Sequence, residues 1–137
     1  MRVVLDTCIL FSALRSSTGA AFRIISSLPN SKFRPVVSTP VFFEYEEVLH
    51  RPKQFPHLSA QDIEDFLDFM ASACDHVRIN FLWRPQLPDP DDDLILELAV
   101  SGQVDAIVTF NRRDFSGIER FGIRVISPQE LIKEIKL

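Results

Sequence analysis

The chain has 137 residues, of which 46% are hydrophobic and 25% are charged, and its formal net charge is −4. This size and composition fit one globular domain, residues 1–137, with its own hydrophobic core. The negative charge argues against a protein whose main device is a basic nucleic-acid patch. It does not exclude nucleic acid, because divalent ions held by the acids would cancel the excess charge.

Apolar runs and helical periodicity alternate along the chain. Unbroken β-branched runs predict strands buried on both faces, as in a parallel sheet, and apolar residues three and four positions apart predict helices. The predicted elements are, in chain order, strand 2–5, helices 7–14 and 19–28, strand 33–38, helices 41–51 and 63–74, strand 76–79, helix 94–100, strands 104–110 and 122–127, and a last helix after residue 127. This alternation predicts an α/β sandwich with a mostly parallel five-stranded sheet and helices on both faces.

Polar residues mark where several of these helices begin. Thr39 is expected to cap one helix, with Pro40 at its first position. Ser59 and Asp62 predict a cap for the helix that follows. The segment SPQE (127–130) has the pattern of a capping box for the last helix. In a parallel sheet, helix starts lie at the edge where the strands end, and such folds place their sites at that edge.

Acidic residues gather at the same predicted edge. Asp6 directly follows the first strand, and Asp114 lies just after the fourth. Glu44 lies one turn into the helix after the second strand, and PDPDDD (88–93) opens the buried helix 94–100. Each acid alone has an ordinary explanation as a helix cap or an exposed residue. Because the carboxyl ends of parallel strands meet, we expect these acids to converge, which caps alone do not explain.

Helical spacing narrows the choice among the acids on each helix. Asp92 shares a face with the apolar residues three, four and seven positions later, so it is expected to point along the packed side. Asp93 lies about 100° round the helix and is either a cap partner or a second ligand. Glu44 and Glu46 flank the apolar stripe of their helix on opposite borders, and periodicity does not choose between them.

Converging carboxylates without histidine or cysteine partners suit a hard cation. Cys8 and Cys74 lie in apolar stretches and form no C-x-x-C pair, so we expect reduced core thiols, and the histidines lack zinc-type spacing. Mg²⁺ or Mn²⁺, as one or two ions, prefers oxygen ligands and supports phosphodiester hydrolysis. A rival enzyme class, phosphotransfer through an aspartyl phosphate on Asp6, requires a second Asp two residues later, where the chain has Cys8.

The apolar N-terminus raises the question of a signal or membrane segment. Asp6 interrupts its apolar run, and no apolar window approaches the roughly 20 residues needed to span a bilayer. We therefore expect a cytoplasmic protein that makes no membrane contact.

Several segments of the chain resemble the motif blocks of PIN-domain proteins. They are VVLDTCILFSAL, STPVFFEYEEVLHRP, PDPDDDLILELA and DAIVTFNRRDF, and the resemblance runs from residue 2 to about residue 131. They look most like the toxin components of bacterial and archaeal toxin–antitoxin systems. The resemblance implies a PIN-like three-layer α/β/α sandwich, a metal-dependent ribonuclease with an RNA substrate, a homodimer and an antitoxin partner.

Carried over position by position, the resemblance assigns a site. The acids that would bind metal and carry catalysis are Asp6, Glu44, Asp92 and Asp114, so Glu44 is favoured over Glu46. The residues that would support them through hydrogen bonds are Thr7, Ser12 and Thr109. Cys8 stands where the family often has Asn, and Asn111 where many relatives have Asp. Asp93 and Asn111 are further candidate ligands.

Two sets of surface residues complete the expectations. The arginines that would follow the RNA backbone are Arg15, Arg23, Arg112 and Arg113, although an exposed position without any role explains each equally well. The phenylalanines off the apolar stripes, candidates for a homodimer or antitoxin contact, are Phe43, Phe55, Phe69 and Phe81. The alternative function is a catalytically weak or silent PIN-fold module that acts mainly by binding a protein partner.

Overall fold

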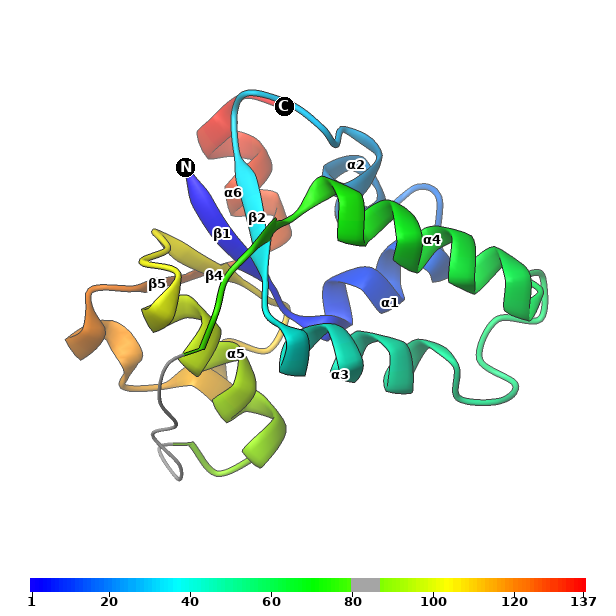
Figure 1. The fold of residues 1–137 in the computed structure, drawn as a ribbon. Helices are drawn as coiled ribbons and strands as arrows, with labels where there is room; N and C mark the ends of the chain where they lie inside the picture. Colours follow the sequence, from blue (N-terminus) through cyan, green and yellow to red (C-terminus); the bar gives the residue numbers. More distant parts are fainter. Residues whose placement is uncertain (80–86) are drawn as a thin grey trace.

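A parallel sheet forms the centre of the fold in the computed structural model, which describes residues 1–79 and 87–137 (Figure 1). In chain order the elements are β1 (Arg2–Leu5), α1 (Thr7–Arg15), α2 (Ala20–Ser26), β2 (Arg34–Val37), α3 (Thr39–Leu49), α4 (Ala60–Ala73), β3 (Asp75–His76), α5 (Pro90–Ser101), β4 (Ala106–Val108), the 3₁₀ helices η1 (Arg112–Phe115) and η2 (Ile118–Phe121), β5 (Arg124–Ile126) and α6 (Pro128–Ile135). The order of strands and helices predicted from the sequence is confirmed, with a five-stranded sheet in the described residues.

The order in which strands are added across the sheet reverses at β1, because β2 and β3 lie on one side of it and β4 and β5 on the other. The order is β3-β2-β1-β4-β5, and all neighbouring strands are parallel. Val3 lies opposite Ala106 and Leu5 lies opposite Val108, so β1 and β4 end together. Both strands are buried, which explains why their sequences are apolar without alternation. The carboxyl ends of β1 and β4 are therefore the edge where this fold class places a site.

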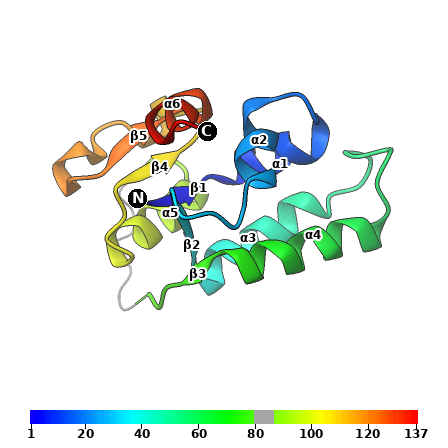
Figure 2. The same cartoon turned by 90° about the horizontal axis from the view of Figure 1, so that it is seen from above.

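Helices cover both faces of the sheet. Figure 2 shows α5 on one side of the sheet and α1, α2 and α6 on the other, where α3 and α4 extend beside α1. α5 contacts β1 and β4 directly, and its central residues are buried. The result is the three-layer α/β/α sandwich expected from the sequence.

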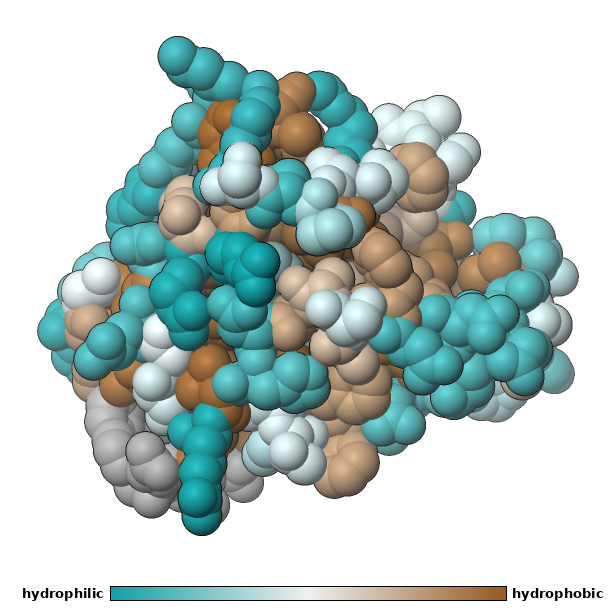
Figure 3. Space-filling view, turned by 45° about the horizontal axis from the view of Figure 1, so that its top comes forward, coloured by the Kyte–Doolittle hydropathy of each residue, from teal (hydrophilic) through white to brown (hydrophobic). Residues whose placement is uncertain are grey.

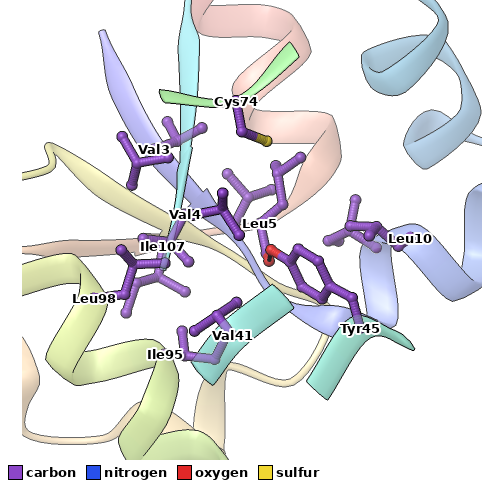
Figure 4. Close-up of a cluster of buried hydrophobic side chains, with 14 of the residues drawn as sticks. Val3, Val4, Leu5, Leu10, Val41, Tyr45, Cys74, Ile95, Leu98 and Ile107 are labelled. Carbon is purple, nitrogen blue, oxygen red and sulfur yellow. Dashed lines mark hydrogen bonds between the residues drawn. The ribbon is translucent and has the colours of Figure 1, made fainter. Parts of the chain in front are cut away.

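The core lies between these layers. Figure 4 shows apolar side chains of β1, α1, α3, α5 and β4 meeting around Val4 and Ile107 (Figure 4). The surface is mixed, with apolar residues gathered between hydrophilic ones on the face that Figure 3 shows (Figure 3). In the described residues no single helix is long and apolar enough to cross a membrane, although the bent pair α1 and α2 reaches that length and composition together.

Local details differ from the sequence expectations in three places. The cap of α3 is Ser38, whose hydroxyl accepts from the Val41 N–H, so the prediction of Thr39 was wrong by one residue. The third strand is shorter and earlier than predicted, because only Asp75–His76 pairs with β2. α5 begins at Pro90, because Asp89 caps it and the acids form its first turn. The capping boxes before α4 and α6 are confirmed.

Candidate functional site

Asp6 is fixed at the carboxyl end of β1. Its backbone N–H donates to the Val108 carbonyl at 3.0 Å, which continues the pairing of β1 with β4. Its side chain caps α1, because Oδ1 accepts from the Thr7 N–H at 2.8 Å. The other carboxylate oxygen, Oδ2, accepts from the Thr109 hydroxyl at 2.7 Å. The buried Asp6 carboxylate therefore has one oxygen tied to α1 and one tied to the segment after β4.

Thr109 organises the turn that follows β4. It is fully buried, and its Oγ1 accepts from the Asn111 N–H at 3.0 Å while donating to Asp6. Cys8 is the third member of this cluster, with its Sγ 3.5 Å from Asp6 Oδ2 and 3.6 Å from Thr109 Oγ1. Cys8 is a free thiol packed against the core, as predicted, but its sulfur also contacts a carboxylate and a hydroxyl, which the sequence did not indicate. Burial, and then the Asp6 charge, raises the pKa of the Cys8 thiol to about 11.

Tyr45 connects α3 to the same peptide. Its buried hydroxyl donates to the Leu5 carbonyl at 2.5 Å, and Figure 4 shows its ring reaching from α3 to the end of β1 (Figure 4). The Leu5–Asp6 peptide therefore has its carbonyl held by α3 and its N–H held by β4. The sequence does not predict this contact, whose one signal is a tyrosine hydroxyl on the buried face of α3.

The acids of PDPDDD take separate roles. Asp89 caps α5, because its side chain accepts from the Asp91 N–H at 2.9 Å. Asp93 is buried and accepts from the Leu87 N–H at 3.0 Å, so it fastens the segment before the helix. Asp91 is exposed, and Asp92 is half-buried. Asp93 is thus the more buried of the two acids that the sequence singled out on this helix.

Asp92 lies within electrostatic reach of acids from two other elements. Burial raises its pKa to about 7, and the charges of Asp6, Asp114, Asp89 and Asp91 add to this effect. Burial also raises the pKa of Asp6, to which the Asp114 charge contributes, against the lowering effect of the hydrogen bonds. Asp6, Asp92 and Asp114, from the end of β1, α5 and η1, therefore lie within electrostatic range of one another.

Glu44 occupies a neighbouring position rather than the same one. It is half-buried on α3, and burial raises its pKa, followed by the charges of Asp91 and Glu47. Its electrostatic neighbours are thus acids at the start of α5 and on its own helix, together with Arg51, whose charge lowers the pKa. Glu44 borders the cluster of Asp6, Asp92 and Asp114 on the side of Asp91.

The donor set fits a hard divalent cation by its chemistry. Asp6, Asp92 and Asp114 offer oxygen ligands only, and in residues 1–79 and 87–137 none of them forms an ion pair with a basic side chain. In the same described residues, no three potential ligands already stand in a geometry that could hold a metal ion. Asp114 is exposed and Asp92 half-exposed, so side-chain rotation about these residues is the movement that binding would require.

The other candidate residues fall into two groups. Asn111 and Arg113 line a cavity of about 430 Å³ beside Asp114, together with Thr109, Phe110, Arg112 and Ser127. Arg112 is paired with Glu130. Arg15 lies at the opposite end of α1 from the Asp6 cap, with its guanidinium 5.9 Å from the Phe11 ring centroid, and Arg23 donates to the Leu137 carbonyl at 2.8 Å. Of these four candidate arginines, only Arg112 and Arg113 line the cavity beside Asp114.

The remaining predicted positions have mixed placements. Thr7 contributes its backbone N–H to Asp6. Ser12 is half-buried in α1, and among the described residues its side chain makes no hydrogen bond to Asp6.

The phenylalanines proposed for a contact surface differ in exposure. Phe43 is 63% exposed and Phe69 lines an apolar cavity, as a contact surface requires. Phe55 is buried with its ring centroid 5.1 Å from that of Phe11, so its assignment to a surface was wrong. Phe81 lies outside the described residues.

Comparisons with known proteins agree with this architecture. The profile of the PIN domain family matches residues 2–113. No curated protein sequence matches the chain significantly. A chain of VapBC2 from Rickettsia felis, crystallised bound to a DNA fragment from its promoter, is 16% identical with a TM-score of 0.63, covering 93% of this chain and 98% of that one. A chain of VapBC-1 from nontypeable Haemophilus influenzae is 15% identical with a TM-score of 0.61, covering 94% and 99%.

At these low identities the solved structures show only that the fold is similar, whereas the profile match shows family membership. The match runs from β1 to the second residue of η1 and therefore includes Asp6, Glu44 and Asp92, while Asp114 follows directly after its last residue. The chain belongs to the PIN-domain family.

Proposed function

We propose that this protein is a Mg²⁺- or Mn²⁺-dependent ribonuclease that cleaves RNA endonucleolytically and is the toxin of a toxin–antitoxin pair. Members of the PIN-domain family are typically nucleases, and the family generally uses divalent metals. The observation that carries the proposal is the meeting of Asp6, Asp92 and Asp114, acids from three separate elements without a basic partner in the described part of the chain. Grouped acids of this kind are characteristic of sites that hold a cation.

The chain's own residues have distinct tasks in such a site. Asp6 is the fixed ligand, because two hydrogen bonds orient its carboxylate before any cation arrives. Asp92 and Asp114 would complete the site by rotating toward it, and Glu44 would contribute from α3, directly or through water. Asp93 is engaged with the Leu87 N–H and holds the start of α5 in place.

The reaction is hydrolysis of a phosphodiester. A water oxygen forms a bond to phosphorus, one P–O ester bond breaks, and the leaving oxygen takes a proton. When bound, a divalent ion supplies Lewis-acid assistance to the attacking water and to the leaving oxygen. The carboxylates must be ionised to hold the ion, so the raised pKa of Asp92 predicts activity that increases as the pH rises through about 7.

Substitution of the acids tests this proposal. Asp6→Asn should fold because Asn also caps helices well, and Asp92→Asn should fold because Asp89, not Asp92, caps α5. Both should lose metal-stimulated cleavage of a labelled single-stranded RNA by at least about 100-fold. Asp68→Asn is the matched control, since Asp68 is exposed on α4. Undiminished cleavage by folded Asp6→Asn and Asp92→Asn proteins would refute the site.

The role of α3 is tested by a pair of glutamates. Glu44→Gln should weaken Mn²⁺ affinity several-fold, whereas Glu46→Gln should leave it unchanged, because the acids of α5 contribute to the raised pKa of Glu44. Titration of Mn²⁺ against protein fluorescence measures both affinities. Equal affinities for the two variants would remove Glu44 from the site.

The toxin role requires a protein partner. An apolar cavity of about 190 Å³ between α1, α2 and α4, lined by residues that include Leu14, Phe66 and Phe69, offers a surface for an antitoxin or a second copy of the chain. The resemblance to toxin components and the fold shared with VapBC chains support an antitoxin, and we propose a cytoplasmic homodimer as the free form.

A silent binding module is the second candidate. It is favoured by the absence, in residues 1–79 and 87–137, of a ready metal-holding geometry. Addition of millimolar Mn²⁺ separates the two functions, because specific binding to the folded state must raise the melting temperature. An increase that Asp6→Asn abolishes supports the nuclease, and no increase supports the silent module.

A further inference from the structure

Phe110 is an exposed aromatic side chain on a rigid turn beside the acids. It is 44% exposed, although it directly follows the fully buried Thr109. The turn is fixed on both sides, because the Thr109 N–H donates to the Ile126 carbonyl at 3.0 Å and the Asn111 N–H donates to Thr109 Oγ1 at 3.0 Å. The phenyl ring is therefore held at the surface by the same contacts that position Asp6.

Phe110 lines the same cavity as Asp114 and Arg113. This cavity of about 430 Å³ adjoins a second one of about 530 Å³, and the two share Arg112 and Arg113. The second cavity also includes Arg124. A hollow thus runs from Asp114, past the ring of Phe110, to a cavity lined by three arginines and by Glu119 and Glu130.

Only one of these arginines has its charge uncommitted within the described residues. Arg112 is paired with Glu130, and Arg124 donates to both carboxylate oxygens of Glu134 at 2.7 and 3.1 Å. Arg113 makes no ion pair in the part of the chain that the structure describes. Its guanidinium is therefore the one that can bind an anionic ligand without first breaking an existing pair.

We infer that Phe110 and Arg113 form a nucleotide subsite, in which a base of a single-stranded nucleic acid stacks on Phe110 and a neighbouring phosphate binds Arg113. The inference rests on the proposed function, since it places the RNA strand that is to be cleaved in the cavity lined by Phe110 and Arg113. Proteins that bind single-stranded nucleic acids combine aromatic faces, on which bases stack, with cations that bind the phosphates. A paired base in a duplex keeps its faces covered, so the subsite selects unpaired segments.

Binding measured without cleavage tests the subsite. The probe is a fluorescein-labelled decameric oligoadenosine RNA, followed by anisotropy with Ca²⁺ in place of Mg²⁺, and a gel checks that the RNA stays intact. Phe110→Ala should weaken binding about 5- to 150-fold, the effect of losing one stacked base. Phe110→Trp should retain or improve binding, because its ring offers a larger face.

Two further variants supply the controls. Phe22→Ala removes a similarly exposed phenylalanine (38%) from the apolar cavity between α1, α2 and α4, the surface proposed for a protein partner, and since no acid lines that cavity it should bind RNA like the wild type. Arg113→Ala should lower the slope of log K against log salt by about 0.7, as expected for one lost phosphate contact on a single strand, while Phe110→Ala should leave the slope unchanged. Melting temperatures confirm that each variant is folded.

The outcomes separate this inference from the proposed function. Equal RNA affinity for folded Phe110→Ala and Phe22→Ala proteins overturns the subsite, even if the wild type cleaves RNA with Mn²⁺. Loss of a protein complex in Phe110→Ala with no change in RNA affinity also overturns it and assigns the ring to a protein interface. Specific loss of RNA affinity in Phe110→Ala supports the subsite, even if the wild type never cleaves RNA and the nuclease assignment fails.

Discussion

Carboxylates at the two ends of the parallel sheet differ in ion pairing and in the direction of their pKa shifts. At the amino ends of the strands, Asp75 is paired with Arg34 at 2.5 Å and with Arg2 at 3.3 Å, and the Arg34 hydrogen bond in particular lowers the pKa of Asp75. At the carboxyl ends, Asp6 and Asp92 have no such partner in the described residues, and both pKa values are raised. The same residue type is therefore neutralised by the chain at one end and left unneutralised at the other.

This difference indicates which end is built for a ligand. Paired surface charges need nothing further, whereas grouped and partly buried acids destabilise the folded state until a proton or a cation joins them. The hydrogen bonds of Thr109 and Tyr45 hold the carboxyl ends in place despite this cost. If the comparison is correct, substitutions at the two ends should differ in size and in sign.

The largest effect is expected at Thr109. Thr109→Val keeps the buried volume but leaves Asp6 Oδ2 without its hydroxyl donor and the Asn111 N–H without its acceptor. We expect the free energy of unfolding, measured by urea denaturation, to fall by about 1–3 kcal/mol, and RNA cleavage to fall with it. Thr109→Ser keeps the hydroxyl and is the control. A Val variant as stable and active as the Ser variant would contradict the role of this hydrogen bond.

Tyr45 should give the next largest effect. Tyr45→Phe keeps the buried ring and removes only the hydroxyl that donates to the Leu5 carbonyl. The unpaired carbonyl should lower the free energy of unfolding by about 1–2 kcal/mol. Because that carbonyl belongs to the peptide before Asp6, Mn²⁺ affinity should weaken as well. Reduced stability with unchanged Mn²⁺ affinity would show that Tyr45 supports the fold alone.

The general location of the acids was accessible from the sequence because it depends on local rules. An apolar strand followed by Asp6, and a Pro with acids before a buried helix, predict positions at one sheet edge without knowledge of any long-range contact. The capping boxes before α4 and α6 are local for the same reason. Local patterns also fixed the order of elements, and hence the fold class.

The exact partners were not accessible, because they depend on contacts between distant segments. Ser38 and Thr39 are adjacent residues of similar capping ability, and only the path of the chain after β2 selects Ser38. The burial of Asp93 depends on the Leu87 N–H, which comes from an irregular segment. Cys8 faces Thr109, 101 positions later, and no spacing rule connects them.

An effect with the opposite sign is expected at Asp92, and it should be smaller than the full pKa difference implies, because the side chain is half-exposed and solvent screens its charge. Its pKa in the folded protein is about 7, above its ordinary value of 3.8, so the folded state holds its proton more tightly than the unfolded chain. This contribution to stability is complete below about pH 4 and is lost as the pH rises through about 7. The melting temperature of the metal-free protein should therefore decline over this range. Asp92→Asn should flatten the decline and raise the melting temperature at pH 8 by a few degrees.

Two comparisons make the Asp92 measurement decisive. Asp68→Asn, on the exposed face of α4, removes the same charge elsewhere and should leave the pH profile unchanged. Mn²⁺ should stabilise the wild type at pH 8 more than the Asp92→Asn protein, because the ion replaces the proton among the acids. A pH profile that Asp92→Asn and Asp68→Asn alter equally would attribute the decline to net charge.

Asp75→Asn should give the smallest effect, with the reverse sign. The pKa of Asp75 is lowered in the folded protein, so its contribution is present above its unfolded value near 3.8 and is lost as the pH falls through the folded value. Because this acid and its arginines are partly exposed, the variant should lose at most about 1 kcal/mol at pH 7 in low salt, and less in high salt. Thermal melts at two salt concentrations measure this loss. One chemical change, Asp to Asn, would then stabilise one end of the sheet and destabilise the other, and equal signs would mean that the acids at the carboxyl ends are ordinary surface charges.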